Sequence, residues 1–204
     1  MRNQFEHIYL INLERRPDRL EAVAEQLQSI GVTYEVVKAI DGDVEEIDFV
    51  KRADMWNKNS AALALTTLKI LEDAKKNNYK SILIFEDDIE FTVNASRMLD
   101  RLKWLKSDEW DMLHFGTIDK ERVKKYNNSW SKLTNSFCCH AYAINSNCYD
   151  EYIEEIEKMD RPIDHITIDT FQTKGKCYKM NNTVCYQKKD FSNIRKRKVK
   201  YIIR

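Results

Sequence analysis

Three consecutive acids, Glu86, Asp87 and Asp88, follow the apolar run Ile82 to Phe85. The run is typical of a buried strand, and open α/β sheets gather their ligands at the carboxyl ends of such strands. Carboxylates crowded this closely repel one another unless a cation or hydrogen-bond donors offset their charge. A divalent metal with oxygen ligands would do so and would also bind a diphosphate.

Side chains alternate along an extended segment, so we expect Glu86 and Asp88 to point to one side and Asp87 to the other. Acids at the first and third positions suit a clamp that holds a metal and a diphosphate, and we predict Glu86 and Asp88 as its ligands. From this segment alone two alternatives stay open. The acids could form a solvated strand end, or they could belong to an aspartate-based phosphatase.

Complementary charge lies around the first predicted turn between a strand and a helix, where we find Asn12, Arg15, Arg16 and Arg19. A helix N-terminus and guanidinium groups suit a phosphate or a carboxylate. The alternative is that Arg15 and Arg16 only form surface pairs with Glu14 and Asp18.

The hydrophobic pattern predicts strands alternating with helices. Strands are expected at 8–13, 34–40, 82–85, 111–115 and 140–144, and helices at 17–30, 60–74, 94–105, 147–159 and 164–173, with Ser60 as an N-cap. Such alternation favours an α/β sheet with helices on both faces. A chain of 204 residues suits one core, so we predict a single domain at 1–187 and a basic tail at 188–204.

The tail from Lys188 to Arg204 holds eight Lys or Arg residues and one acid, Asp190, which gives it a net charge of +7 in a chain whose total is +1. We expect it either to contact an anionic membrane surface or to remain solvated. The acidic body lacks interleaved aromatic and basic residues, so no nucleic-acid partner is expected.

The five cysteines are odd in number and form no CxxC pair, so we expect reduced, mostly buried thiols instead of disulfides or a zinc site. The N-terminal ten residues lack the apolar stretch of a signal peptide, and no apolar run is long enough to span a bilayer. We therefore expect a cytoplasmic protein, with peripheral contact at the inner membrane face as the tail's contribution.

Several segments together resemble glycosyltransferase family 25, which includes bacterial lipooligosaccharide galactosyltransferases and procollagen galactosyltransferases. In chain order the matching segments are IYLINLERRPDR (8–19), AIDGD (39–43), ILIFEDDIEF (82–91), WDMLHFG (110–116), AYAIN (141–145), PID (162–164) and DFSNI (190–194). The resemblance implies a GT-A-like nucleotide-binding sheet flanked by helices. It also implies a UDP-sugar donor, Mn²⁺ or another divalent cation, a saccharide, lipid-linked or glycoprotein acceptor, and inversion at the anomeric carbon.

Roles follow from the resemblance position by position. Asp164 is the expected base for the acceptor hydroxyl, and Asp88 the direct metal ligand with Glu86. The expected contacts to the donor are Asn12, Arg15, Arg16, Arg19, Asp41, Glu86, Asp87, Asp190 and Ser192. The alternative function is a nucleotide-sugar or glycan binding module of the same fold that has lost its chemistry.

One departure favours that alternative. Family members often carry a Ser-His pair in the helix before the acids, where this chain has Thr66 and Thr67. A threonine hydroxyl can stand in for serine but not for an imidazole. Of the remaining histidines, His114 and His140 are expected to be buried in the core, and His165 lies beside Asp164.

Overall fold

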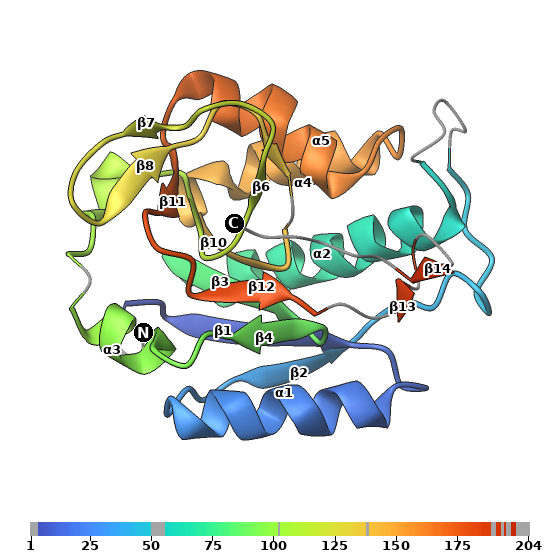
Figure 1. Cartoon of the computed structure of the whole chain (residues 1–204). Helices are drawn as coiled ribbons and strands as arrows, with labels where there is room; N and C mark the ends of the chain where they lie inside the picture. Colours follow the sequence, from blue (N-terminus) through green and yellow to red (C-terminus); the bar gives the residue numbers. More distant parts are fainter. Residues whose placement is uncertain are drawn as a thin grey trace.

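The computed structural model describes residues 4–49, 56–101, 103–137, 139–188, 191–192, 194 and 197–198. An eight-stranded mixed sheet forms its centre (Figure 1). In spatial order its strands are β2 (Glu35–Lys38), β1 (His7–Asn12), β3 (Ser81–Glu86), β10 (Ala141–Asn145), β5 (Met112–His114), β11 (Cys177–Met180), β8 (Trp130–Lys132) and β7 (Lys124–Lys125).

Three parallel strands end together, and the acids lie at this end of the sheet, where the carboxyl ends of the strands meet. β1 pairs in parallel with β2 on one side and with β3 on the other, and Ile11 stands opposite Glu86. β10 then runs antiparallel to β3, with Ala141 opposite Phe85. The carboxyl ends of β1, β2 and β3 and the start of β10 therefore meet at the same edge.

Helices cover both faces of the sheet (Figure 1). α1 (Pro17–Ser29) lies on one face, and α2 (Lys58–Lys76), α4 (Tyr149–Glu157) and α5 (Ile163–Ile166) lie on the other. β3 shows why two cores form: Ile82 and Ile84 pack toward α2, whereas Leu83 and Phe85 pack toward α1. The predicted α/β architecture, a sheet flanked by helices on both faces in a single domain, is confirmed.

The ends of several elements differ from expectation. α2 begins earlier than predicted, because the side chain of Asn57 accepts hydrogen bonds from the backbone N–H groups of Asn59 and Ser60, and the Ser60 hydroxyl accepts one from the Asn57 N–H. Ser60 is thus the third helical residue and not the N-cap. α3 (Ala95–Asp100) is shorter than the predicted helix at 94–105, and the helix predicted at 164–173 is split into α5, a π-helical turn (Thr167–Phe171) and a 3₁₀ turn (Gln172–Lys174).

Short strands outside the expected pattern surround the edge that carries the acids. β4 (Ile89–Phe91) pairs with β12 (Cys185–Gln187), β6 (Ile118–Asp119) with β9 (Ser136–Phe137), and β13 (Phe191–Ser192) with β14 (Arg197–Lys198). β12 crosses so near the end of β5 that a Cβ on Gly116 would lie 2.2 Å from the Cys185 carbonyl oxygen. Glycine is therefore required at that crossing.

Four of the cysteines, Cys139, Cys148, Cys177 and Cys185, are free and buried, as expected, and Cys138 lies outside the described residues. The described helices include none that is long and apolar enough to cross a membrane.

The capping of α2 gives a test of the fold. Replacing Asn57 with Ala removes the side-chain acceptor for two helical N–H groups, and we expect the free energy of unfolding to fall by about 1 kcal/mol in urea titrations. Asn94 precedes α3 in the corresponding position but makes no capping bond, so Asn94→Ala is the matched control and should change stability far less. Equal losses in the two variants would contradict the assigned cap.

Candidate functional site

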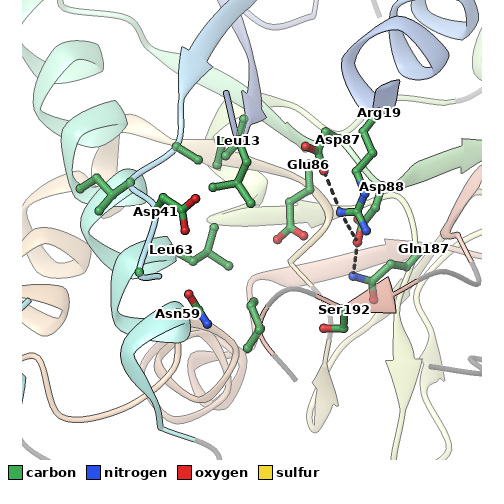
Figure 2. A pocket seen from close by; sticks show the side chains of 15 residues that line it. Leu13, Arg19, Asp41, Asn59, Leu63, Glu86, Asp87, Asp88, Gln187 and Ser192 are labelled. Carbon is green, nitrogen blue, oxygen red and sulfur yellow. Dashed lines mark hydrogen bonds and ion pairs between the residues drawn. The ribbon is translucent and has the colours of Figure 1, made fainter. Parts of the chain in front are cut away.

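A cleft of about 610 Å³, its open mouth included, lies where β1, β2 and β3 end, and Figure 2 shows the side chains that line it. Its walls come from the ends of those strands, from the first turns of α1 and α2, and from the last part of the chain. The lining residues are Ile11, Leu13, Arg19, Ala39, Ile40, Asp41, Gly42, Asn59, Leu63, Glu86, Asp87, Asp88, Gln187, Ser192 and Ile194. All three predicted acids therefore border one cavity.

A second hollow, which we call the basin, adjoins the cleft and has a volume of about 1440 Å³ including its open mouth. It shares Leu63, Glu86, Gln187, Ser192 and Ile194 with the cleft. Its other lining residues are Ser60, Ile118, Lys120, Phe137, Cys139, His140, Pro162, Ile163, Asp164 and His165. Glu86 stands at the junction of the two hollows.

Asp87 is held inside the protein by two side chains. Asn12 Nδ2 donates to Asp87 Oδ2 at 2.7 Å, and Arg19 Nη1 donates to Asp87 Oδ1 at 3.1 Å. The side chains of Arg19 and Asp87 are each only 9% exposed. Asn12 is buried and also donates to the Arg16 carbonyl, so its amide fixes the start of α1 against the acids.

Asp88 has one occupied and one vacant carboxylate oxygen. Its Oδ2 accepts a hydrogen bond from Gln187 Nε2 at 2.9 Å and lies 3.7 Å from Arg19 Nη1. Its Oδ1 is buried and meets no hydrogen-bond partner among the described residues. A buried carboxylate oxygen without a donor is costly, and a bound cation would offset that cost.

The predicted alternation of side-chain directions does not continue beyond Glu86. β3 stops there, and Asp87 and Asp88 form a two-residue turn before β4, so their directions follow the turn and not the strand period. Figure 2 shows the Glu86 carboxylate in the open space of the cleft, while Asp87 and Asp88 lie on either side of the Arg19 guanidinium.

The crowding shifts the acidities. Burial, followed by the charges of Asp88, Asp164 and Asp87, raises the pKa of Glu86 well above its usual range. Burial, followed by the charge of Asp87, raises the pKa of Asp88 from 3.8 to about 6. Burial also raises the pKa of Asp87, although Arg19 and Asn12 oppose that effect. The site thus holds more negative charge than its own donors neutralise.

The donor set fits a divalent metal in part. Within the described ranges, no three His, Cys, Asp or Glu side chains cluster closely enough to hold an ion by themselves. Glu86 and Asp88 supply hard oxygen atoms, and a ligand diphosphate would have to complete the coordination. That sharing is the arrangement expected of a site where metal and nucleotide bind together.

The other predicted donor contacts separate into two groups. Asp41 lines the cleft, where it accepts a hydrogen bond from Arg15 Nε and one from the Asp43 N–H. Arg15 also pairs with Asp43 at 3.0 Å, and Arg16 pairs with Asp18 at 2.7 Å. Neither arginine belongs to the lining of the cleft as the described residues define it, and the surface pair of Arg16 matches the alternative given for it.

Asp164 lines the basin together with Glu86 and lies in the first turn of α5. Its Oδ1 accepts a hydrogen bond from the Cys139 N–H at 3.0 Å, which ties α5 to the chain before β10. Its charge contributes to the raised pKa of Glu86, so the two carboxylates interact through the basin. His165 lines the same basin.

The two threonines that depart from the family pattern lie inside the core and not in either hollow. Both are fully buried. The Thr66 hydroxyl accepts from the Ile40 N–H at 3.0 Å and donates to the Ala62 carbonyl, and the Thr67 hydroxyl donates to the Leu63 carbonyl. Thr66 thus anchors α2 to the segment after β2, and Thr67 has no direct path to a ligand.

The predicted tail returns to the site. Ser192 and Ile194 line both hollows, the Lys188 N–H donates to the Asp88 carbonyl at 2.6 Å, and Asn57 Nδ2 donates to the Ile194 carbonyl at 3.3 Å. Asp190 and most of the basic residues lie outside the described residues, so their roles and the membrane contact stay predictions.

Several lining residues carried no signal in the sequence. Gln187 reaches Asp88 only because β12 pairs with β4 across nearly a hundred residues, and Phe137 reaches the basin through the β6–β9 pairing. Asn59 could have been predicted as a site residue from its place in the first turn of a helix, because the N-terminus of a helix can bind an anionic ligand. His140 was expected in the core, and it is 1% exposed, but it also lines the basin.

Residues 5–167 match the family model described as glycosyltransferase family 25 (LPS biosynthesis protein). Among the similar curated proteins is a glycosyltransferase 25 family member of Drosophila pseudoobscura pseudoobscura, 28% identical over 61% of this chain and 22% of its own length. Another is the human inactive glycosyltransferase 25 family member 3, 26% identical over 55% of this chain and 22% of its own. A third is the procollagen galactosyltransferase 1-A of Xenopus laevis, 25% identical over 55% and 21%.

The match spans only about a fifth of the length of these relatives. Among solved structures, the chain is similar to a glycosyltransferase involved in the glycosylation of the major capsid of PBCV-1, with a TM-score of 0.48, 9% identity, and coverage of 81% of this chain and 74% of that one.

The raised pKa of Asp88 gives a second test, made in EDTA without ligand. Its folded-state pKa of about 6 lies above the ordinary 3.8, so ionised Asp88 destabilises the fold above pH 6 and this penalty fades as the pH falls toward 4. Asp88→Asn should therefore be more stable than the parent by about 1–3 kcal/mol at pH 7.5, and the difference should shrink at pH 4.5.

The comparison is made by urea unfolding of the two proteins at both pH values. Because His140 and the other titrating groups are present in both, the change in their difference isolates the carboxylate cluster. A stability difference that does not vary with pH would show that Asp88 is not strained by its charge.

Proposed function

The chain belongs to glycosyltransferase family 25, and from that premise we propose that it transfers a galactose-like sugar from a UDP-sugar to a saccharide, lipid-linked or glycoprotein acceptor with inversion, using Mn²⁺ or another divalent cation. A glycosyltransferase takes a nucleotide-sugar donor and a saccharide acceptor, and two adjoining hollows accommodate two substrates. The observation that carries the proposal is the place of Glu86, which lines both the cleft and the basin, together with Asp88, which lines the cleft.

The cleft suits the donor. Its far end combines the apolar side chains of Leu13 and Ile40 with the polar groups of Asp41 and Asn59, which suits a planar base and a ribose. Its near end carries Arg19 and the acids. We infer that the diphosphate lies at this end, where the metal would offset its charge and that of Asp88.

Glu86 and Asp88 would hold the metal, which supplies charge neutralisation for the departing UDP. The protein would present these two carboxylates to the metal, while hydrogen bonds from Arg19 and Asn12 hold the third, Asp87. Gln187 orients Asp88 by occupying Oδ2, which leaves Oδ1 as the free ligand atom.

Asp164 is the proposed base. It borders the basin, and its carboxylate is oriented by the Cys139 N–H on one oxygen. An acceptor in the basin and a donor in the cleft would approach each other from opposite sides of the junction, which is what a single inverting displacement requires. Asp164 would take the proton of the attacking hydroxyl.

The second candidate function is a binding module without catalysis. It is favoured by one observation, the similarity to curated proteins named as inactive members of the family. The buried place of Thr67 weakens the argument from the missing imidazole, because a side chain there does not border either hollow. The two candidates differ in turnover and not in donor binding.

The base assignment predicts a separation of binding from turnover. Asp164→Asn should keep the thermal stabilisation by UDP and Mn²⁺, because the change lies outside the cleft, and should lower the transfer rate by about 10²–10⁴-fold. Asp169→Asn, an exposed carboxylate in the turn that follows α5, is the matched control and should leave both unchanged. EDTA should abolish the stabilisation by UDP in all three proteins.

Thermal shifts and release of UDP from a panel of UDP-sugars provide the measurements. Stabilisation without turnover by the unaltered chain, across all acceptors tried, would favour the binding module. If UDP and Mn²⁺ give no stabilisation at all, the assignment of the cleft is wrong.

A further inference from the structure

The basin contains an aromatic side chain that neither the donor site nor the base requires. Phe137 lines the basin from β9 and is only half-buried. Half-exposed aromatic rings in concave polar surroundings commonly serve as binding platforms, because their burial by a ligand is favourable and their two side-chain torsions cost little entropy to fix. The chain therefore places an apolar surface in the same hollow as its proposed base.

The platform is held rigidly from beneath. Asp119, paired with Ser136 across the β6–β9 ladder, accepts hydrogen bonds from Thr117 and Ser136, each at 2.8 Å, and from Lys179 at 2.6 Å. The Gln172 side chain binds both the N–H and the carbonyl of Ser136, at 2.9 and 2.8 Å. The residue before Phe137 is thus fixed by two partners, which suits a preorganised binding surface.

Polar groups flank the ring. His140 is 1% exposed and lines the basin, and its ring interacts with the Cys185 backbone. Its Nε2 lies on the side of Gly116, where a built Cβ would be 2.6 Å away, and its Nδ1 meets no hydrogen-bond partner among the described residues. Its carbonyl accepts from the Glu86 N–H at 2.9 Å, so the imidazole is anchored next to the junction of the two hollows. A buried imidazole in this position can exchange a hydrogen bond with a hydroxyl group that enters the basin.

The remaining neighbours of Phe137 are positioned at its rim. The His165 ring meets it edge-on, with centroids 5.4 Å apart, and the Lys120 ammonium lies 5.5 Å from its centroid. Lys120 is exposed, so a ligand can displace its ammonium group from the ring. The carboxylates of Glu86 and Asp164 border the same space, and this negative charge disfavours an anionic ligand more than one exposed lysine favours it.

We propose that the basin is the acceptor subsite and that it binds a neutral pyranose, whose apolar face packs on Phe137 while one hydroxyl group hydrogen-bonds to His140. A pyranose has this combination of an apolar C–H face and a polar edge. The inference rests on the proposed function for its account of turnover, but the binding itself is measurable without turnover. Without its open mouth the basin holds about 500 Å³, within the roughly 300–1,000 Å³ of small-molecule pockets, so a pyranose fits.

The test is saturation-transfer difference NMR on the full chain with Mg²⁺ and UDP, using methyl β-D-galactopyranoside, methyl β-D-glucopyranoside and methyl β-D-glucuronide as probes. We expect saturation of the ring protons on one face of at least one neutral glycoside. Phe137→Ala should reduce that signal at least threefold, and Phe137→Leu should reduce it less. Tyr126→Ala, which removes an exposed aromatic ring outside the basin, is the matched control and should leave it unchanged.

Thermal stabilisation by UDP and Mn²⁺ is measured on every variant. If it persists while no glycoside shows saturation, or while Phe137→Ala leaves the signal intact, the acceptor subsite is wrong and the donor assignment stands. A stronger signal from the glucuronide would overturn the neutral class. If UDP gives no stabilisation but Phe137→Ala removes a glycoside signal, the subsite holds and the proposed transfer fails.

Discussion

The buried contact of Arg19 and Asn12 with Asp87 is the interaction on which the site depends. Three adjacent acids at a strand end repel one another, and only one of them can be neutralised by the chain without removing the site's capacity for a ligand. Arg19 and Asn12 engage Asp87 directly, and because both belong to the β1–α1 unit, the same contact fixes the first helix to the central strand. Glu86 and Asp88 are left for another cation.

The direction of the strands explains why two hollows meet at these acids. β1, β2 and β3 run in parallel and end together, which opens the cleft among their carboxyl ends. β10 runs the other way, so its entry, with Cys139 and His140, is brought to the same edge. The chain before β10 carries Phe137, and its Cys139 N–H binds Asp164. A single reversal in the sheet therefore places the proposed base and the ring of the basin next to the acids.

The sequence alone predicted those features of the fold and the site that depend on residues close together in the chain. The apolar run before the acids, the amphipathic helices after β1 and before β3, and the alternation of strands with helices predicted the core of the sheet and the position of Glu86 to Asp88. The family motifs predicted Arg19, Asp41, Asp164 and Ser192, all of which line a hollow. The roles of these residues remain predictions. Sequence failed at Gln187 and Phe137, because their positions depend on two-residue or three-residue strands whose pairing is set by tertiary packing.

Some residues around the site are held by hydrogen bonds, and others carry charge that the chain does not neutralise. The residue before the basin's ring is held by hydrogen bonds at Ser136, and Asp87 is held by Arg19, whereas Asp88 Oδ1 meets no donor among the described residues and neighbouring acids raise the pKa of Glu86. Burial of unneutralised carboxylates lowers stability, so a fold under selection for stability alone would exchange them for amides. Their presence in this chain is consistent with a positive charge that arrives with a ligand. Under the proposed function, the strain at Glu86 and Asp88 would become binding energy for a metal and a diphosphate, and the basin would set where the second substrate lies relative to them.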